Sequence, residues 1–292
     1  MSGHGKELHF LDMSADRYFV YEGEMAEQIS GFTTNKCSAN VIKVFGERNS
    51  GTNFISQLIQ RNLDVRLLPG GVPRLLYRLL PMEWPRDLWF FITSQWNLGW
   101  KHRYPDKVQV LHFSRKHPLV IVTVSKNPYA WLLSMFRRPY HLQWKGGMFD
   151  DFLHTPCPVV GREKAEKLTP DPVHLWNWKH AAYRGFSELY VPWVHLRYED
   201  VLRDPERAIG RVAEACSISQ HHPFESVLSS TKGEPGKTFL DYREYYLRGE
   251  WRRKFYANQV SWINERLDAN LCRMYGYDWE DPASYPPREA IL

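Results

Sequence analysis

The sequence of 292 residues predicts a three-layer α/β/α fold around a central, mostly parallel β-sheet. Residues 119–124, Leu-Val-Ile-Val-Thr-Val, form a nearly continuous apolar run, which is typical of a strand buried on both faces. Helix-start signals, in which Asn or Asp precedes Pro, occur at Asn127, Asp171 and Asp204. Strands that alternate with helices indicate βαβ units, whose ligands bind beyond the carboxyl ends of the strands.

The alternation begins near residue 40. Residues 41–45 are rich in β-branched side chains and predict a strand, followed by a glycine-bounded turn at 46–51 and an amphipathic helix at 52–61. A second strand is expected near residues 65–68. Another buried strand is expected at residues 193–197, before the Asp204 helix.

The domain organisation follows from these elements. We expect an irregular N-terminal extension at residues 1–38, one α/β domain at residues 39–285 and a C-terminal tail at residues 286–292. Residues 70–97 contain three prolines and predict a broken helix inserted in the domain. Most of the 12 tryptophans are expected in the core or in groove walls.

The composition is that of a globular protein, with 43% hydrophobic and 24% charged residues. No run approaches the ~18 apolar residues of a membrane span, and the first ten residues have no apolar core of a signal peptide. The four cysteines are far apart, so neither a zinc site nor a disulfide framework is predicted. We expect a cytoplasmic protein with no integral membrane segment.

The net charge of +5 fits an anionic ligand as well as an ordinary solvated surface. The basic residues are dispersed, and no helix-turn-helix, RNP or zinc-finger pattern occurs. Nucleic acid is therefore not expected as a partner.

The turn between the first strand and its helix reads Gly46-Glu47-Arg48-Asn49-Ser50-Gly51-Thr52-Asn53. Two glycines five apart at such a junction let backbone N–H groups surround phosphate oxygens at a helix N-terminus. A Walker loop would continue with Lys and Ser/Thr after the second glycine; Thr52 and Asn53 stand there instead. The alternative is a tight turn capped by Ser50.

A second polar pair follows the clearest strand. Lys126 stands at the strand end, and Ser134 lies eight residues later on the helix that Asn127 and Pro128 begin. A cation and a hydroxyl in these positions could hold a phosphate group. The alternative is a capped helix whose Lys126 and Ser134 face solvent.

In register with each other, these two segments resemble the fingerprints of the PAPS-dependent sulfotransferase family. Its first fingerprint is a Pro-Lys/Arg-Ser-Gly-Thr-like loop, matched by Ser50, Gly51 and Thr52; its second is an Arg-(Asn/Asp)-Pro turn with a serine eight residues beyond the cation. The chain departs from the family at Asn49, where a cation is usual, and at Lys126, where arginine is commoner.

Two further segments resemble the family in the same order. Tyr198-Glu199-Asp200 resembles its Tyr-Glu-Asp segment, whose aromatic ring contacts adenine. Residues 249–255 resemble its Gly-x-Trp closing loop, and Arg243 and Arg248 are candidates for the basic residues upstream of it. The resemblance extends from about residue 40 to 280.

The resemblance implies a P-loop-like phosphosulfate-binding loop, PAPS (3'-phosphoadenylyl sulfate) as donor substrate, PAP as product and no metal. Lys126 and Ser134 would bind the 3'-phosphate, with help from Arg248, and Tyr198 would border adenine. Arg48 and Lys101 would stabilise the departing phosphate. The 5'-phosphosulfate would be held by Arg48, Asn49, Ser50, Gly51, Thr52 and Asn53.

The general base expected is His102, in a segment that resembles the family's Lys-x-His-x-Pro neighbourhood. The ordinary histidine pKa of ~6.5 suits a proton acceptor near neutral pH. A carboxylate base would be Glu47.

Two other functions stay open: a P-loop small-molecule kinase, and a non-catalytic nucleotide-binding protein that keeps the fold. For a sulfotransferase, the acceptor would be a hydroxyl compound, with a saccharide as first candidate. Its specificity would come from residues 70–97 and 140–169.

Overall fold

The computed structural model describes residues 41–73, 82–140, 144, 146–158, 160–164, 168–231 and 236–288. The expected N-terminal extension at residues 1–38 lies outside these residues, as do the last four residues of the expected tail. The fold and the candidate site are those of the described residues only.

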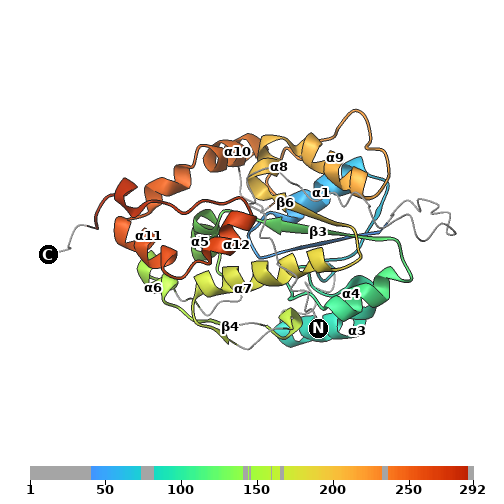
Figure 1. The fold of residues 1–292 in the computed structure, drawn as a ribbon, viewed down its shortest axis with the longest axis horizontal. Helices are drawn as coiled ribbons and strands as arrows, with labels where there is room; N and C mark the ends of the chain where they lie inside the picture. The colour runs from blue at the N-terminus through green and yellow to red at the C-terminus, as the bar shows by residue number, and fades with distance from the viewer. Residues whose placement is uncertain are drawn as a thin grey trace, which may run out of the picture. The chain divides into compact units, whose positions relative to one another are not determined.

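Four parallel strands form the central sheet, in the order β2-β1-β3-β6 (Figure 1). The register pairs Val41 with Leu119 and Gly46 with Val124, so β1 and β3 end side by side. The predicted strands are confirmed, with bounds β1 Val41–Gly46, β2 Arg66–Leu67, β3 Leu119–Ser125 and β6 Trp193–Arg197.

Both faces of the sheet are covered, because alternate side chains of each strand enter two different cores. Val44 and Val122 pack in one core with α1 and α9, whereas Phe45 and Ile121 pack in the other with α4 and η2. Figure 1 shows α4 and α9 on opposite sides of the sheet. The three-layer α/β/α fold is therefore confirmed. These elements are α1 Thr52–Asn62, α4 Lys107–Ser114, α9 Pro205–Ala215 and η2 Gly185–Glu188.

The three predicted helix starts are confirmed, and each has the expected side-chain cap. Asn127 accepts hydrogen bonds from the backbone of Tyr129 and Ala130, Asp171 from His174, and Asp204 from Arg207. These caps begin α5 Pro128–Arg137, α7 Pro172–Arg184 and α9.

The rest of the described chain consists of short elements around this sheet. In the inserted segment, the described residues form helix α3 Glu83–Asn97, and residues 74–81 before it lie outside the described part. The others are α6 Phe149–Leu153, β4 Cys157–Pro158, η1 Gly161–Glu163, β5 Leu168–Thr169, α8 Tyr198–Arg203, α10 Phe239–Leu247, η3 Glu250–Lys254, α11 Ala257–Asn264, α12 Ala269–Met274 and η4 Pro282–Ser284.

Candidate functional site

The loop between β1 and α1 makes a tight turn that only glycine tolerates at its last position. Gly51 has a φ of 93°, and a Cβ there would lie 2.3 Å from Cδ2 of Tyr198. Gly51, and not Ser50, is the residue that precedes α1, while the Ser50 hydroxyl donates to the Glu47 carbonyl at 2.5 Å. The first N–H groups of α1 have no partners within the helix, which makes this end of α1 suited to an anion.

Behind the loop lies a buried cluster of four charged side chains from three distant segments. Arg48 pairs with Glu47 (Nε–Oε1, 2.8 Å) and with Glu163 of η1 (Nη2–Oε1, 2.9 Å). Lys179 of α7 lies 3.3 Å from Glu47 and 3.5 Å from Glu163. Two cations and two carboxylates balance, and all four side chains are at most 2% exposed.

The charge balance in this cluster fixes the state of Glu47. Burial favours its neutral form, but the nearby charges of Lys179 and Arg48 outweigh burial and lower the pKa of Glu47 to about 2. A carboxylate with so low a pKa is a poor proton acceptor at neutral pH. Glu47, the carboxylate alternative to His102, is thus engaged in holding Arg48 and Lys179.

At the end of β3, Lys126 and Ser134 are in direct contact. The Lys126 ammonium donates to the Ser134 hydroxyl at 2.9 Å and to the Tyr246 hydroxyl at 2.5 Å, and Lys126 is fully buried. One turn earlier on α5, the Ala130 carbonyl accepts from Ser134 at 2.8 Å. The separation of eight residues therefore does bring this cation and this hydroxyl together, away from solvent.

The two strand ends converge. The Trp131 indole of α5 donates to the Arg48 carbonyl at 2.6 Å, and Lys126 Nζ lies 3.5 Å from the Asn49 carbonyl. Asn49 also donates to the Arg138 carbonyl at 3.1 Å. Among the described residues, the buried atoms Asn49 Oδ1 and Arg48 Nη1 have no hydrogen-bond partner. Such atoms point to a bound water or ligand group at the loop.

An aromatic recess lies beside Gly51. Its walls include Phe54 of α1, Tyr198 of α8 and Phe239 of α10, with Phe54 and Phe239 stacked at 5.8 Å. Tyr198 meets Tyr246 edge to face at 5.2 Å, which joins the recess to the Lys126 pair. The open space is about 20 Å³, enough for roughly one water.

Sequence reasoning placed Tyr198 at such a site and missed its other aromatic walls. Phe54 follows the loop by only two residues, and its position on the first turn of α1 was a usable signal. Phe239 and Tyr246 of α10 carry no comparable signal, because only tertiary packing brings α10 to α8.

His102 contacts the loop directly. Its Nδ1 lies 2.5 Å from the Gly46 carbonyl, so Nδ1 carries the proton and Nε2 keeps a basic lone pair. Burial, and then the charge of Lys101, lower the pKa of His102 well below its ordinary value. The imidazole is therefore neutral at pH 7, so Nε2 has a lone pair that can accept a proton, while the lowered pKa makes it a weaker base than an ordinary histidine.

Lys101 reaches the first turn of α1. Its ammonium donates to the Asn53 side chain, and its carbonyl accepts from Gly46 N–H at 3.0 Å. Burial lowers the pKa of Lys101 to about 8. Lys101, His102 and the loop thus form one cluster around the end of β1.

Arg248 lies apart from this cluster. Its side chain is 70% exposed and pairs with Glu244 at 2.8 Å, whereas Lys126 is fully buried. In the same segment, Trp251 is buried and stacks on Tyr129 of α5 at 6.1 Å. The expected closing loop therefore packs on the helix that carries Ser134.

Comparison with known proteins gives little. No family model matches the chain, and no curated protein matches it. Among solved structures, the chain is similar to the sulfotransferase from Alicyclobacillus acidocaldarius, with a TM-score of 0.44 and 11% identity over 82% of this chain and 96% of that chain.

Proposed function

We propose that this protein is a PAPS-dependent sulfotransferase that transfers a sulfuryl group to a hydroxyl of an acceptor. The observation that carries the proposal is the buried contact between Lys126 and Ser134, 2.9 Å apart, at a strand end adjacent to the loop of β1. Two anion-binding elements at neighbouring strand ends suit a nucleotide that carries phosphates at both its 5' and 3' positions.

The loop and the Lys126 pair would divide the binding of this nucleotide. Asn49, Ser50, Gly51, Thr52 and Asn53 would hold the phosphosulfate, since the loop leads into the free N–H groups of α1. Lys126 and Ser134 would hold the 3'-phosphate. The recess beside Gly51 would take adenine between Phe54, Tyr198 and Phe239.

The recess must open to take adenine, because its present space of about 20 Å³ fits roughly a water. Phe239 and Tyr242 of α10 form its outer wall and would have to move. Arg248, one residue beyond the end of α10, would reach the 3'-phosphate only as part of such a movement.

In the transfer, the acceptor oxygen bonds to sulfur, the bond from sulfur to the 5'-phosphate oxygen breaks, and the acceptor proton leaves. His102 Nε2 is the base we assign to that proton, because Nδ1 is already committed to Gly46. Lys101 would neutralise the charge that develops on the leaving phosphate oxygen.

For Arg48 we propose a positioning role. Its guanidinium is held by Glu47 and Glu163, so most of its charge is already balanced inside the protein. One nitrogen, Nη1, has no hydrogen-bond partner among the described residues and would be able to donate to a water or a ligand oxygen. Arg48 would therefore hold the loop in shape. Asn49 stands where the resembled family usually has a cation, and Lys101 would supply that positive charge instead.

Isothermal titration with PAP and with 5'-AMP tests whether Lys126 and Ser134 bind a 3'-phosphate. The wild-type protein should bind PAP more tightly than 5'-AMP, because only PAP has a 3'-phosphate. Lys126→Met and Ser134→Ala should each weaken PAP binding about 10- to 100-fold, the size of a lost charge-assisted hydrogen bond, with little change for 5'-AMP. The exposed Lys116→Met is the matched control. Equal affinities for the two nucleotides in the wild type would refute the assignment.

Catalysis needs a separate measurement, transfer from ³⁵S-labelled PAPS across saccharide, phenol and lipid acceptors. Transfer to one class establishes the activity. PAP binding without transfer to any of them would instead favour the non-catalytic nucleotide-binding protein, and turnover of Mg-ATP without PAPS would favour the kinase.

A further inference from the structure

Helix α3 carries its large apolar side chains on the outside of the protein. Trp84, Phe91 and Trp96 are 65%, 67% and 69% exposed, and Leu88 and Ile92 are exposed between them. At 100° per residue, these five side chains fall within an arc of roughly 140°. They form one continuous apolar stripe, which we call the α3 stripe.

The opposite side of α3 packs on the protein and is mostly polar. Its buried residues are Arg86, Phe90, Ser94 and Asn97. Arg86 pairs with Glu83 at 2.8 Å, and Asn97 accepts from the Gly99 N–H at 2.8 Å. A surface helix ordinarily buries its apolar side and exposes its polar side. Because α3 does the reverse, its stripe needs a partner outside the described chain.

The charges around the stripe favour an anionic partner. The two acidic residues of α3, Glu83 and Asp87, both pair with Arg162 of η1 at 2.7 Å. Lys164, which is exposed, lies over the ring of Phe91 at 5.3 Å. The acidic charge of the helix is thus balanced, while a cation stands at the edge of the stripe.

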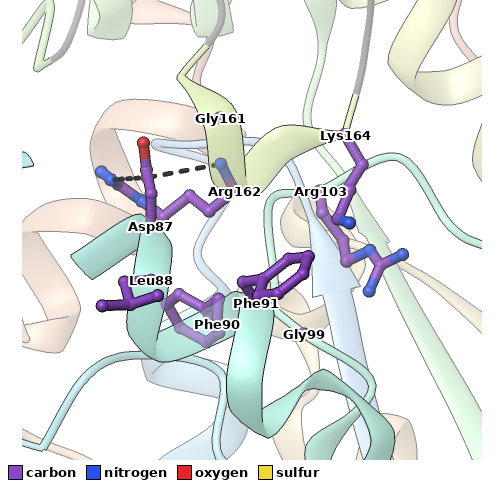
Figure 2. A pocket seen from close by; sticks show the side chains of 9 residues that line it. All are labelled: Asp87, Leu88, Phe90, Phe91, Gly99, Arg103, Gly161, Arg162 and Lys164. Atoms are coloured by element: carbon purple, nitrogen blue, oxygen red, sulfur yellow. Dashed lines mark hydrogen bonds and ion pairs between the residues drawn. The ribbon is translucent and has the colours of Figure 1, made fainter. Parts of the chain in front are cut away.

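A cavity of about 350 Å³ continues from the stripe, and its lining includes three cations together with the carboxylate Asp87. Figure 2 shows Leu88 and Phe91 of α3 on one side of it and Arg103, Arg162 and Lys164 around the rest. The apolar stripe and the cavity meet at Leu88 and Phe91, with Lys164 beside Phe91. This arrangement matches a ligand surface with an anionic head beside an apolar chain.

We propose that α3 is an interfacial helix that seats this protein on an anionic lipid bilayer. The α3 stripe would enter the boundary between headgroups and acyl chains, with its two tryptophans about 18 Å apart along the helix axis. Trp rings favour that level of a bilayer. Lys164, at the edge of the stripe, would receive a headgroup phosphate. None of the described helices is long and apolar enough to cross a bilayer, so α3 lies on the surface.

This inference stands apart from the proposed function, and its test contains no nucleotide. The full chain is sedimented with vesicles of phosphatidylcholine alone and of phosphatidylcholine with about 30% phosphatidylglycerol, enough to give the surface a negative potential. We expect binding to the anionic vesicles. The triple variant Trp84→Ser, Phe91→Ser, Trp96→Ser should lower the partition coefficient at least tenfold, and Lys164→Glu should lower it severalfold on anionic vesicles only.

The matched control replaces three exposed apolar residues on other segments, Leu228→Ser, Leu240→Ser and Met274→Ser, and should bind as the wild type does. All substituted side chains are exposed, so circular dichroism should report the same fold for every variant. Wild-type chain that stays in the supernatant overturns the proposal. An equal loss of vesicle binding in the control variant overturns it too. A third contrary outcome is a wild type that binds no vesicles but self-associates in sedimentation velocity, with only the α3 triple variant abolishing that self-association.

Discussion

The loop after β1 and helix α3 depart in opposite directions from the usual distribution of side chains. Behind the loop, four charged side chains are buried and neutralise one another. On α3, five large apolar side chains face outward while Arg86 and Asn97 face inward. The two regions are joined at η1, where Glu163 belongs to the charged cluster and Arg162 pairs with α3.

This contrast indicates a different role for each region. Buried charges are costly, so their pairing indicates that the loop needs a fixed shape more than it needs stability. Exposed apolar surface is costly as well, and on α3 it indicates a partner other than the described residues. The rigid, polar loop suits ligand binding and chemistry at the strand ends. The apolar stripe of α3 suits attachment to the partner proposed for it.

The largest effect expected at the loop concerns His102. In His102→Asn the side-chain amide can still donate to the Gly46 carbonyl, but the basic Nε2 is lost. We expect kcat of sulfuryl transfer to fall by about 10²- to 10⁴-fold, the usual contribution of a general base. Calorimetry should show unchanged PAP affinity. A variant that keeps wild-type kcat would remove His102 from the mechanism.

The buried cluster should be the most sensitive point for stability. Glu163→Gln leaves two buried cations facing one carboxylate, and we expect the free energy of unfolding to fall by about 3–5 kcal/mol. Guanidinium denaturation measures this change. Glu265→Gln removes an exposed partner of Arg266 and should change stability by no more than about 0.5 kcal/mol. Similar losses in both variants would contradict the structural role of the cluster.

Two adjacent phenylalanines of α3 sharpen the contrast within one helix. Phe90 is buried, so Phe90→Ala should cost about 3 kcal/mol or more in the free energy of unfolding. Phe91 is 67% exposed, and Phe91→Ala should stay within about 0.5 kcal/mol of the wild type. Denaturation of the two variants side by side tests the inverted orientation of α3. A larger loss for Phe91→Ala would refute it.

The smallest expected effect is a change in pH dependence. In the proposed mechanism the protonated form of Lys101 stabilises the leaving group. Its pKa is about 8, so kcat/KM should decline as pH rises through 8. Because the pKa of His102 is lowered, its neutral form persists well below its ordinary pKa of ~6.5, and the acid decline should come late. Arginine stays protonated at every pH tested, so Lys101→Arg should remove the alkaline decline. Lys116→Arg should leave the decline unchanged, and an unaltered profile in Lys101→Arg would exclude Lys101 as the titrating cation.

The sequence alone determined the elements that depend on local chemistry. The strand at residues 119–124 and the helix starts at Asn127, Asp171 and Asp204 were predicted correctly, since a buried strand and a helix cap each need only a few neighbouring residues. The contact between Lys126 and Ser134 follows for the same reason: a strand end and the second turn of the next helix are held close by the chain itself.

Tertiary structure decided whatever depends on distant segments. The buried cluster of Glu47, Arg48, Glu163 and Lys179 forms only because the loop, η1 and α7 pack together. In this cluster the guanidinium of Arg48 is paired with carboxylates. Most tryptophans were expected in the core or in groove walls, and Trp84 and Trp96 are exceptions on the outside of α3. Hydrophobic periodicity shows that the two sides of α3 differ, but not which side faces inward; polar contacts of Arg86 and Asn97 settle that orientation.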